Sequence, residues 1–289
     1  MSKDNGRIEV IENIKKYSQS GEFHNKVELN DPVLTNDQNR LITDNYIKNR
    51  NTFNYKIKRN AAVFIAKTAT VFINHDTVIK GLEKIPENLS GVIITSNHFS
   101  PFENTVVRYL TNKLDKRLNI ISQTSNFAMT GIIGFLMNYA DTIPISPEPH
   151  YLARDFMKIL KEKTVDKGEA VLLYPEQEMW FNYRKPRPPK KGAYYYAAKL
   201  NVPVLSCFVE VIDTDKDASE QFKKVRYVMH VLGLLKPDMN LSVKENSQLL
   251  ADRDYELKKQ CYEEVYNKPL DYSFDASDIA GFKGEAFGS

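Results

Sequence analysis

The sequence predicts an α/β fold, with a mostly parallel central sheet flanked by helices and a helical leader at the N-terminus. Two observations support this prediction. Short apolar runs typical of buried strands alternate with longer segments of helical periodicity. The chain of 289 residues is also long enough to bury a large core, as one large domain or two small ones.

Three segments differ in composition. Residues 1–55 are polar and rich in Asn, Asp, Lys and Glu, which predicts a helical or partly disordered leader with little core of its own. Residues 56–266 carry the alternating pattern and are expected to form the functional domain. Residues 267–289, rich in Asp, Gly and Ser, are expected to form a loose C-terminal tail.

The elements expected within 56–266 alternate along the chain. The predicted strands are 92–96, 119–122, 170–174, 202–211 and 225–232. The predicted helices are 102–113, 128–139, 150–163, 191–200 and 247–266.

Composition excludes several classes of protein. A net charge of +3 is too small to indicate nucleic-acid binding by itself. Cys207 and Cys261 lie far apart and match no metal or disulfide pattern, so a reducing cytosol fits and no metal is expected. Residues 1–20 lack the apolar core of a secretory signal, and no apolar run is long enough to span a bilayer.

One apolar segment, residues 60–73, has a basic lead-in formed by Lys56, Lys58 and Arg59. This pattern is typical of a helix lying in a membrane interface. It is equally typical of a core helix with a solvated basic start. The sequence leaves both readings open.

The first polar motif is Asn-His-Phe-Ser-Pro-Phe-Glu at residues 97–103, directly after a predicted buried strand. His98 is a possible general base, and Glu103 a carboxylate that orients it. Ser100 as N-cap and Pro101 in the first turn would place Glu103 at the start of a helix. The alternative is a helix-terminal charge or a capping box with no catalytic role.

A second motif, Pro175-Glu176-Gln177, follows the predicted strand 170–174. Ligands of parallel sheets collect at the carboxyl ends of the strands. We therefore expect His98 and Glu176 to lie at the same edge of the sheet.

A basic run follows at residues 182–191, and Gly192 then opens a predicted helix. Prolines in the run favour an extended chain that displays its charges. A phosphate site at this junction and an ordinary solvated loop are both consistent with the pattern. The cations of the run are Arg184, Lys185, Arg187, Lys190 and Lys191.

Four blocks in this order resemble the glycerolipid acyltransferase family, which includes lysophosphatidic acid acyltransferases. Asn97-His98 with Glu103 resembles the family's Asn-His, four residues, Asp. Residues 175–179 resemble its Pro-Glu-Gly-Thr-Arg block. Lys191-Gly192-Ala193 and Val202-Pro203-Val204 resemble its two later blocks.

The resemblance implies an acyltransferase domain at 56–266 that moves a fatty acyl group from coenzyme A or acyl carrier protein to a hydroxyl of a lysolipid acceptor similar to lysophosphatidic acid. His98 would be the general base and Glu103 its orienting acid. No cofactor, metal or nucleic acid is implied. The residues expected to bind substrate are Asn97, Ser100, Pro175, Glu176, Gln177, Arg184, Arg187, Lys191 and Gly192.

The chain departs from the family pattern where the acceptor phosphate is held. Met179 stands where the family has an arginine, and residues 122–124 and 142–146 lack its other two cations. A desolvated phosphate without a cationic partner is costly. We therefore expect an acceptor without a phosphomonoester, or one that meets the basic loop. A catalytically inactive lipid- or carrier-binding relative, and an amine or sugar-hydroxyl acceptor, are the alternatives.

Residues 127–140 and the Met179-Trp180-Phe181 cluster are expected to serve the acyl chain or a membrane surface, unless they are ordinary core. Trp180 beside charged residues is typical of an interfacial anchor. We therefore expect peripheral attachment to the cytoplasmic face of the membrane.

Overall fold

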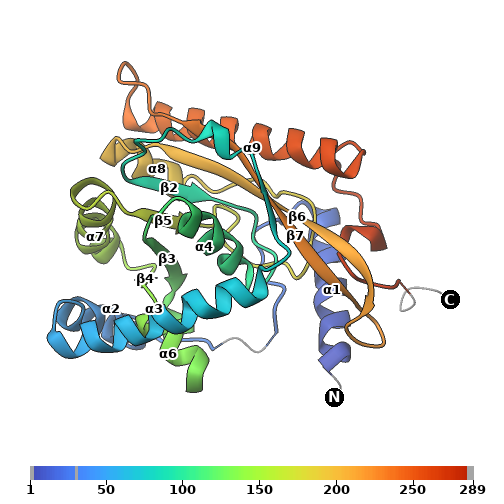
Figure 1. Ribbon diagram of the computed structural model, residues 1–289, viewed down its shortest axis with the longest axis horizontal. Helices are drawn as coiled ribbons and strands as arrows, with labels where there is room; N and C mark the ends of the chain where they lie inside the picture. The colour runs from blue at the N-terminus through green and yellow to red at the C-terminus, as the bar shows by residue number, and fades with distance from the viewer. Residues whose placement is uncertain (1–2, 30–31, 285–289) are drawn as a thin grey trace.

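A computed structural model describes residues 3–29 and 32–284 (Figure 1). Its described strands form one seven-stranded sheet in the order β1-β7-β6-β2-β5-β3-β4. All neighbouring strands pair in parallel except β6 and β7, which are antiparallel. Helices flank this sheet, so the predicted α/β fold with a mostly parallel sheet is confirmed.

The five predicted strands are present, although β6 continues to Asp217, well beyond the predicted end at residue 211. They are β2 (Val92–Thr95), β3 (Leu118–Gln123), β5 (Ala170–Leu173), β6 (Val204–Asp217) and β7 (Lys223–Leu235). The sequence did not predict β1 (Val78–Lys80) or β4 (Thr142–Ile145). Both are short edge strands, and β4 contains Pro144, a residue that sheets tolerate only at their edges.

The predicted helices of the domain are also present. They are α4 (Glu103–Lys113), α6 (Gly131–Tyr139), α7 (Met157–Lys161), α8 (Gly192–Leu200) and α9 (Val243–Tyr266). A short helix, α5 (Thr124–Phe127), precedes α6, and π-helical turns extend α7 at both ends, at Tyr151–Phe156 and Glu162–Asp166.

The sheet lies between two apolar layers. Val92 and Ile94 of β2 pack on one face with the buried side of α4. Ile93, between them, packs on the other face with α7, α8 and α9. Successive side chains of a strand point to opposite faces, so a strand buried on both faces reads as a continuous apolar run.

The N-terminal leader forms α1 (Lys3–Ser20) and α2 (Asn36–Asn49), followed by α3 (Phe53–Ile73). In Figure 1, α1 lies beside the far end of the β6–β7 hairpin. Val10, Ile11 and Ile14 of α1 are buried in a third apolar cluster with Trp180 and Phe222. The expectation of a leader with little core is therefore wrong for α1, because its apolar stripe is completed by residues distant in sequence.

The C-terminal segment is also packed as far as residue 284. Asp278, Ile279 and Ala280 are at most 1% exposed. Ile279 pairs with Tyr183 in an isolated β-bridge. The prediction of a loose tail is wrong for these residues, because their polar groups find partners elsewhere in the chain; residues 285–289 lie outside the described part.

Candidate active site

The two polar motifs lie side by side at the carboxyl edge of the sheet. Strands β2 and β5 are parallel neighbours, and Thr95 pairs in register with Leu173. His98 and Glu176 follow these two residues in the adjoining loops. The backbone N–H of His98 donates a hydrogen bond to Glu176 Oε2 at 3.2 Å. The expectation that both residues share this edge is confirmed.

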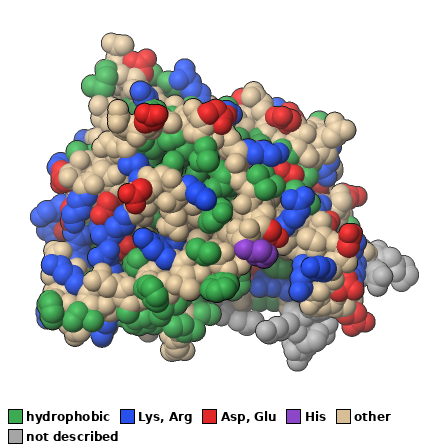
Figure 2. Space-filling model, viewed as in Figure 1, with side chains coloured by type: hydrophobic (Ala, Val, Ile, Leu, Met, Phe, Trp, Pro, Cys, Tyr) green, Lys and Arg blue, Asp and Glu red, His purple; other side chains and the backbone are tan. Residues whose placement is uncertain are grey.

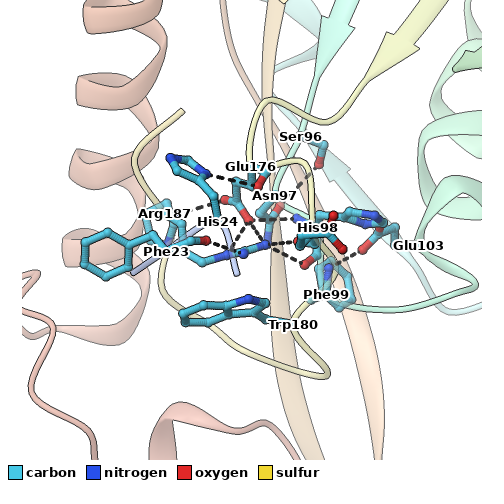
Figure 3. A network of polar contacts seen from close by, with 12 residues as sticks. Phe23, His24, Ser96, Asn97, His98, Phe99, Glu103, Glu176, Trp180 and Arg187 are labelled. Carbon is cyan, nitrogen blue, oxygen red and sulfur yellow. Dashed lines mark hydrogen bonds and ion pairs between the residues drawn. The ribbon is translucent and has the colours of Figure 1, made fainter. Parts of the chain in front are cut away.

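His98 and Glu103 are in direct contact. Nδ1 of His98 meets Oε1 of Glu103, while the backbone N–H groups of Phe99 and Ser100 donate to Oε2 (Figure 3). The His98 side chain is 21% exposed and that of Glu103 only 2%. The carboxylate is therefore fixed by three donors, and the contact through Nδ1 leaves Nε2 of the imidazole for another group.

Helix α4 begins at Glu103, later than predicted, and Phe102 is its N-cap. Ser100 does not cap α4, because its Oγ accepts the N–H of Phe102 at 3.3 Å, within the preceding turn. Half of the alternative capping-box arrangement is present, since Glu103 accepts the N–H of Ser100 at 2.8 Å. The same carboxylate thus shapes the turn and contacts the imidazole.

The backbone donors of this turn are all engaged. The N–H of His98 bonds to Glu176, those of Phe99 and Ser100 bond to Glu103, and that of Phe102 bonds to Ser100. Acyl transfer needs donors for the developing oxyanion. In this arrangement they have to come from outside residues 98–102.

Tyr174 is a site residue that the sequence did not reveal. Its ring stacks on the imidazole of His98, with centroids 4.2 Å apart and planes inclined by 7°. Burial and the nearby charge of Glu103 raise the pKa of Tyr174 well above its usual value. The phenol therefore stays neutral, and the ring limits the orientations open to the imidazole. Its position at the end of β5, just before Pro175, was the available signal.

The side chains of Asn97 and Ser100 are buried and hydrogen-bonded within the protein, so they stabilise the loop and are not exposed to a ligand. Asn97 is 1% exposed and bonds to the backbone of Val209 on β6, accepting at 2.8 Å and donating at 3.0 Å. Ser100 is 7% exposed. The expectation that these two side chains bind substrate does not fit their burial, because both are satisfied within the protein.

The remaining motif positions differ in exposure. Pro175 and Glu176 are buried, whereas Gln177, Lys191 and Gly192 are exposed. Gln177 has φ of 68°, a left-handed conformation that favours glycine. The family's glycine position therefore keeps a glycine-like backbone here although it carries a longer side chain.

The basic loop does not display most of its cations. Lys185 and Arg187 are 3% and 2% exposed. Arg187 pairs with Glu176 at 2.9 Å, Lys185 with Asp278 at 2.7 Å and Arg184 with Asp213 at 2.5 Å. The expected display of Arg184 and Arg187 for phosphate binding is wrong, because acidic partners from other segments neutralise them; Lys190 and Lys191 remain exposed.

Trp180 is also not an interfacial anchor. It is fully buried, its ring lies 4.4 Å from the guanidinium carbon of Arg187, and its indole N–H donates to the carbonyl of Asn25 at 3.0 Å. Close by, His24 Nδ1 lies 3.5 Å from the carbonyl oxygen of Glu176. Burial, with the charges of Lys190 and Arg187, lowers the pKa of His24.

An exposed apolar surface lies near this edge. Along one side of α3, Phe53, Phe64 and Phe72 are 80%, 72% and 76% exposed. Figure 2 shows hydrophobic side chains gathered along the margin of the molecule formed by α3 and the neighbouring α6. Among the described helices, none combines the length and the apolar character needed to cross a bilayer.

Comparisons with known proteins agree with this architecture. Residues 76–210 match the family model described as acyltransferase. No curated protein gives a significant match. The structure is similar to that of the 1-acyl-sn-glycerophosphate (LPA) acyltransferase PlsC from Thermotoga maritima, with 15% sequence identity and a TM-score of 0.50 over 94% of this chain and 100% of that chain.

At that identity the structural similarity concerns the fold. The family match covers all four sequence blocks, including both motifs at the carboxyl edge of the sheet. Residues 76–210 are therefore similar to the acyltransferase family, in agreement with the resemblance that the motifs indicated.

Proposed function

We propose that this acyltransferase moves a fatty acyl group from an acyl thioester to the hydroxyl of a lysolipid, with His98 as general base. The observation that carries the proposal is the contact of His98 Nδ1 with the buried carboxylate of Glu103. A carboxylate at Nδ1 stabilises the tautomer with its lone pair on Nε2 and the imidazolium that forms later.

The reaction proceeds by direct attack. Nε2 of His98 takes the proton of the acceptor hydroxyl while its oxygen attacks the thioester carbonyl. The carbon–sulfur bond breaks as the tetrahedral intermediate collapses, and the imidazolium returns the proton to the leaving thiolate. No acyl-enzyme forms. The donor is acyl-CoA or acyl carrier protein, since both present the same thioester.

For the acceptor, we propose a lysolipid without a phosphomonoester. Met179 replaces the family's arginine, and Arg184 and Arg187 are committed to Asp213 and Glu176. A dianionic headgroup needs several donors to offset its desolvation. The exposed Lys190 and Lys191 remain available for a single negative charge, which suits a phosphodiester or a neutral headgroup.

We also propose that the α3 face attaches the protein peripherally to a membrane. Ile57, Phe64 and Val71 are spaced seven residues apart and are all more than half exposed, and Lys56 and Lys67 are exposed beside them. Apolar side chains flanked by lysines are typical of helices in a membrane interface. This supports the interfacial reading of residues 60–73; the cytoplasmic side stays a prediction from composition.

The catalytic proposal is tested with purified protein, acyl-CoA or acyl carrier protein thioesters, and a panel of lysolipids analysed by mass spectrometry. His98→Ala should reduce transfer by ~10²- to 10⁴-fold, the usual contribution of general base catalysis. Transfer at full rate in His98→Ala would overturn the mechanism, and no transfer to any acceptor would favour the inactive, binding-only relative.

The same panel tests the acceptor. Neutral lysoglycolipids and phosphodiester lysolipids should be preferred over lysophosphatidic acid. A strong preference for lysophosphatidic acid would contradict the acceptor proposal but leave the catalytic one intact. Loss of that preference in Lys190→Gln with Lys191→Gln would assign the phosphate to these two lysines.

The membrane proposal is tested by flotation with anionic vesicles at low salt. Phe64→Ser with Phe72→Ser should weaken binding at least ~10-fold, because each large side chain contributes about 2 kcal/mol when buried in the lipid. A matched control is Leu41→Ser on α2, which is also exposed. Equal binding of both variants would exclude the α3 face.

A further inference from the structure

Arg187 is the most completely enclosed cation near the catalytic edge. Its side chain is 0% exposed. Nε donates to Glu176 at 3.1 Å, and one terminal nitrogen donates to the carbonyl of Phe23 at 2.8 Å. The other terminal nitrogen contacts the carbonyls of His98, at 3.4 Å, and Glu178. With its donors spent on protein groups and no exposed surface, this guanidinium cannot meet a substrate.

The Glu176–Arg187 pair binds both backbone polar groups of His98, the N–H and the carbonyl. The N–H of His98 donates to Glu176 Oε2 at 3.2 Å. Its carbonyl accepts from Arg187 and, at 3.0 Å, from the backbone N–H of Trp180. Figure 3 shows these contacts converging between the imidazole of His98 and the ring of Trp180.

The N-terminal leader completes this arrangement. The carbonyl of Phe23 binds Arg187, and the carbonyl of Asn25 binds the indole of Trp180 at 3.0 Å. Both leader residues precede the segment 76–210 that matches the acyltransferase family. The support of His98 therefore includes chain from outside that segment.

We propose that Arg187 is a positioning residue for His98, and that leader residues 23–25 form part of the active-site support through it. This inference rests on the proposed role of His98 as general base. A planar guanidinium suits the task because its several N–H donors fix several acceptors in one geometry. Small misplacements of a reacting group lower the rate steeply, by about 10²-fold for 1 Å.

Lys185 supplies a matched control in the same loop. It is also buried, and it pairs with the buried Asp278 at 2.7 Å and donates to the carbonyl of Ser273 at 2.6 Å. None of these partners belongs to residues 97–103. Arg187→Met leaves the buried Glu176 without its cation, whereas in Lys185→Met the buried Asp278 keeps a second cation, Lys268, at 2.8 Å. Both variants should lower thermal stability, Lys185→Met by less.

The two variants should differ in catalysis. Arg187→Met is expected to lower kcat ~10- to 100-fold with KM changed less than about 3-fold, because the acceptor and donor sites are untouched. Lys185→Met should keep kcat within about 2-fold of the unmodified protein at a temperature where both are folded. Equal kcat for the two folded variants would overturn the inference.

Milder variants cover the case in which Arg187→Met does not fold. Arg187→Lys keeps the charge beside Glu176 but loses the planar fork, and should recover only part of kcat. Trp180→Phe keeps a ring against Arg187 and removes the hydrogen bond to Asn25; it should lower kcat several-fold with KM unchanged. Full kcat in both would overturn the inference.

Hydrogen exchange separates this inference from the proposed function. The backbone amides of residues 97–100 should exchange faster in Arg187→Lys than in the unmodified protein. In Lys185→Met, their exchange rates should be the same as in the unmodified protein. Faster exchange with no acyl transfer in any form would support positioning while the acyl-transfer proposal fails. Unchanged exchange at 97–100 in Arg187→Lys would overturn positioning even if acyl transfer is found.

Discussion

Two regions of the molecule are built from polar groups in different ways. One is the proposed catalytic edge, residues 97–103 with 174–178. The other is the terminal seam, formed by α1 with residues 180–187 and 271–282. At the edge, His98 and Glu103 are five positions apart and meet within one turn. At the seam, Lys185 reaches Asp278, and Ser18 Oγ lies 3.0 Å from the hydroxyl of Tyr183. The residues that meet at the edge are brought together by their spacing in the sequence. The residues that meet at the seam are brought together by tertiary packing.

The contacts made by charged residues at the edge and at the seam differ in whether they leave a polar group free to bind a ligand. The carboxylate of Glu103 lies next to a partly exposed imidazole, and its contact through Nδ1 leaves Nε2 of His98 for another group. Arg184, Lys185 and Arg187 of the basic loop are paired with acidic groups from other segments, so their contacts leave none. A charge carries function only where its partners leave one side of the site open.

The largest effect is expected at the catalytic edge. Glu103→Gln should lower kcat ~10²- to 10³-fold, because the imidazolium loses its counter-charge and the amide presents a donor to backbone N–H groups. The measurement is acyl transfer under single-turnover conditions. Glu103→Asp is the control that keeps the charge and should lose less; equal losses would show that geometry, not charge, dominates.

At the seam, a core substitution should affect stability without affecting chemistry. Ile11→Ala removes a fully buried side chain and should lower the free energy of unfolding by ~2–5 kcal/mol. The measurement is urea unfolding, with kcat determined well below the transition. Leu41→Ala, at an exposed position, should change stability little. A loss of kcat in folded Ile11→Ala would show that edge and seam are coupled more tightly than their contacts suggest.

A smaller effect is expected where the edge carries backbone strain. Gln177→Gly should raise stability by about 0.5–1 kcal/mol, because relief of the left-handed conformation at φ 68° exceeds the added entropy of the unfolded chain. Glu178→Gly, next to it and without a positive φ, should lower stability instead. Equal shifts in the two variants would contradict the strain at Gln177.

The smallest effect is a pH dependence where edge and seam meet. Burial and nearby cations lower the pKa of His24, so the folded state binds a proton less readily than the unfolded chain. Stability should therefore fall as the pH drops through about 6.5 and level off below the folded pKa. Between pH 7.5 and 5.5, the melting temperature of His24→Gln should fall by about 1–2 °C less than that of the unmodified protein. An identical loss in both would exclude this contribution.

The edge was predictable because short-range rules govern it. An apolar run followed by Asn97-His98 implies a strand and the loop after it, and parallel strands bring Glu176 to the same side. The stack of Tyr174 on His98 was not predictable, because it depends on how β5 lies against β2 and on side-chain direction. The exposure of the α3 face was left open for the same reason, since an apolar helix does not encode which of its sides is covered.

The amino-acid sequence by itself determined the alternation of strands and helices, the α/β class, and the histidine–carboxylate pair at a strand end. Each of these follows from periodicity or from spacing over a few residues. Only the tertiary structure decided that Arg184, Lys185 and Arg187 are paired with acidic groups, that Trp180 is buried, and that α1 and residues 278–280 pack against the domain. Burial and charge pairing depend on segments far apart in the chain, and the free energy of a buried ion pair depends on partners that no local pattern specifies.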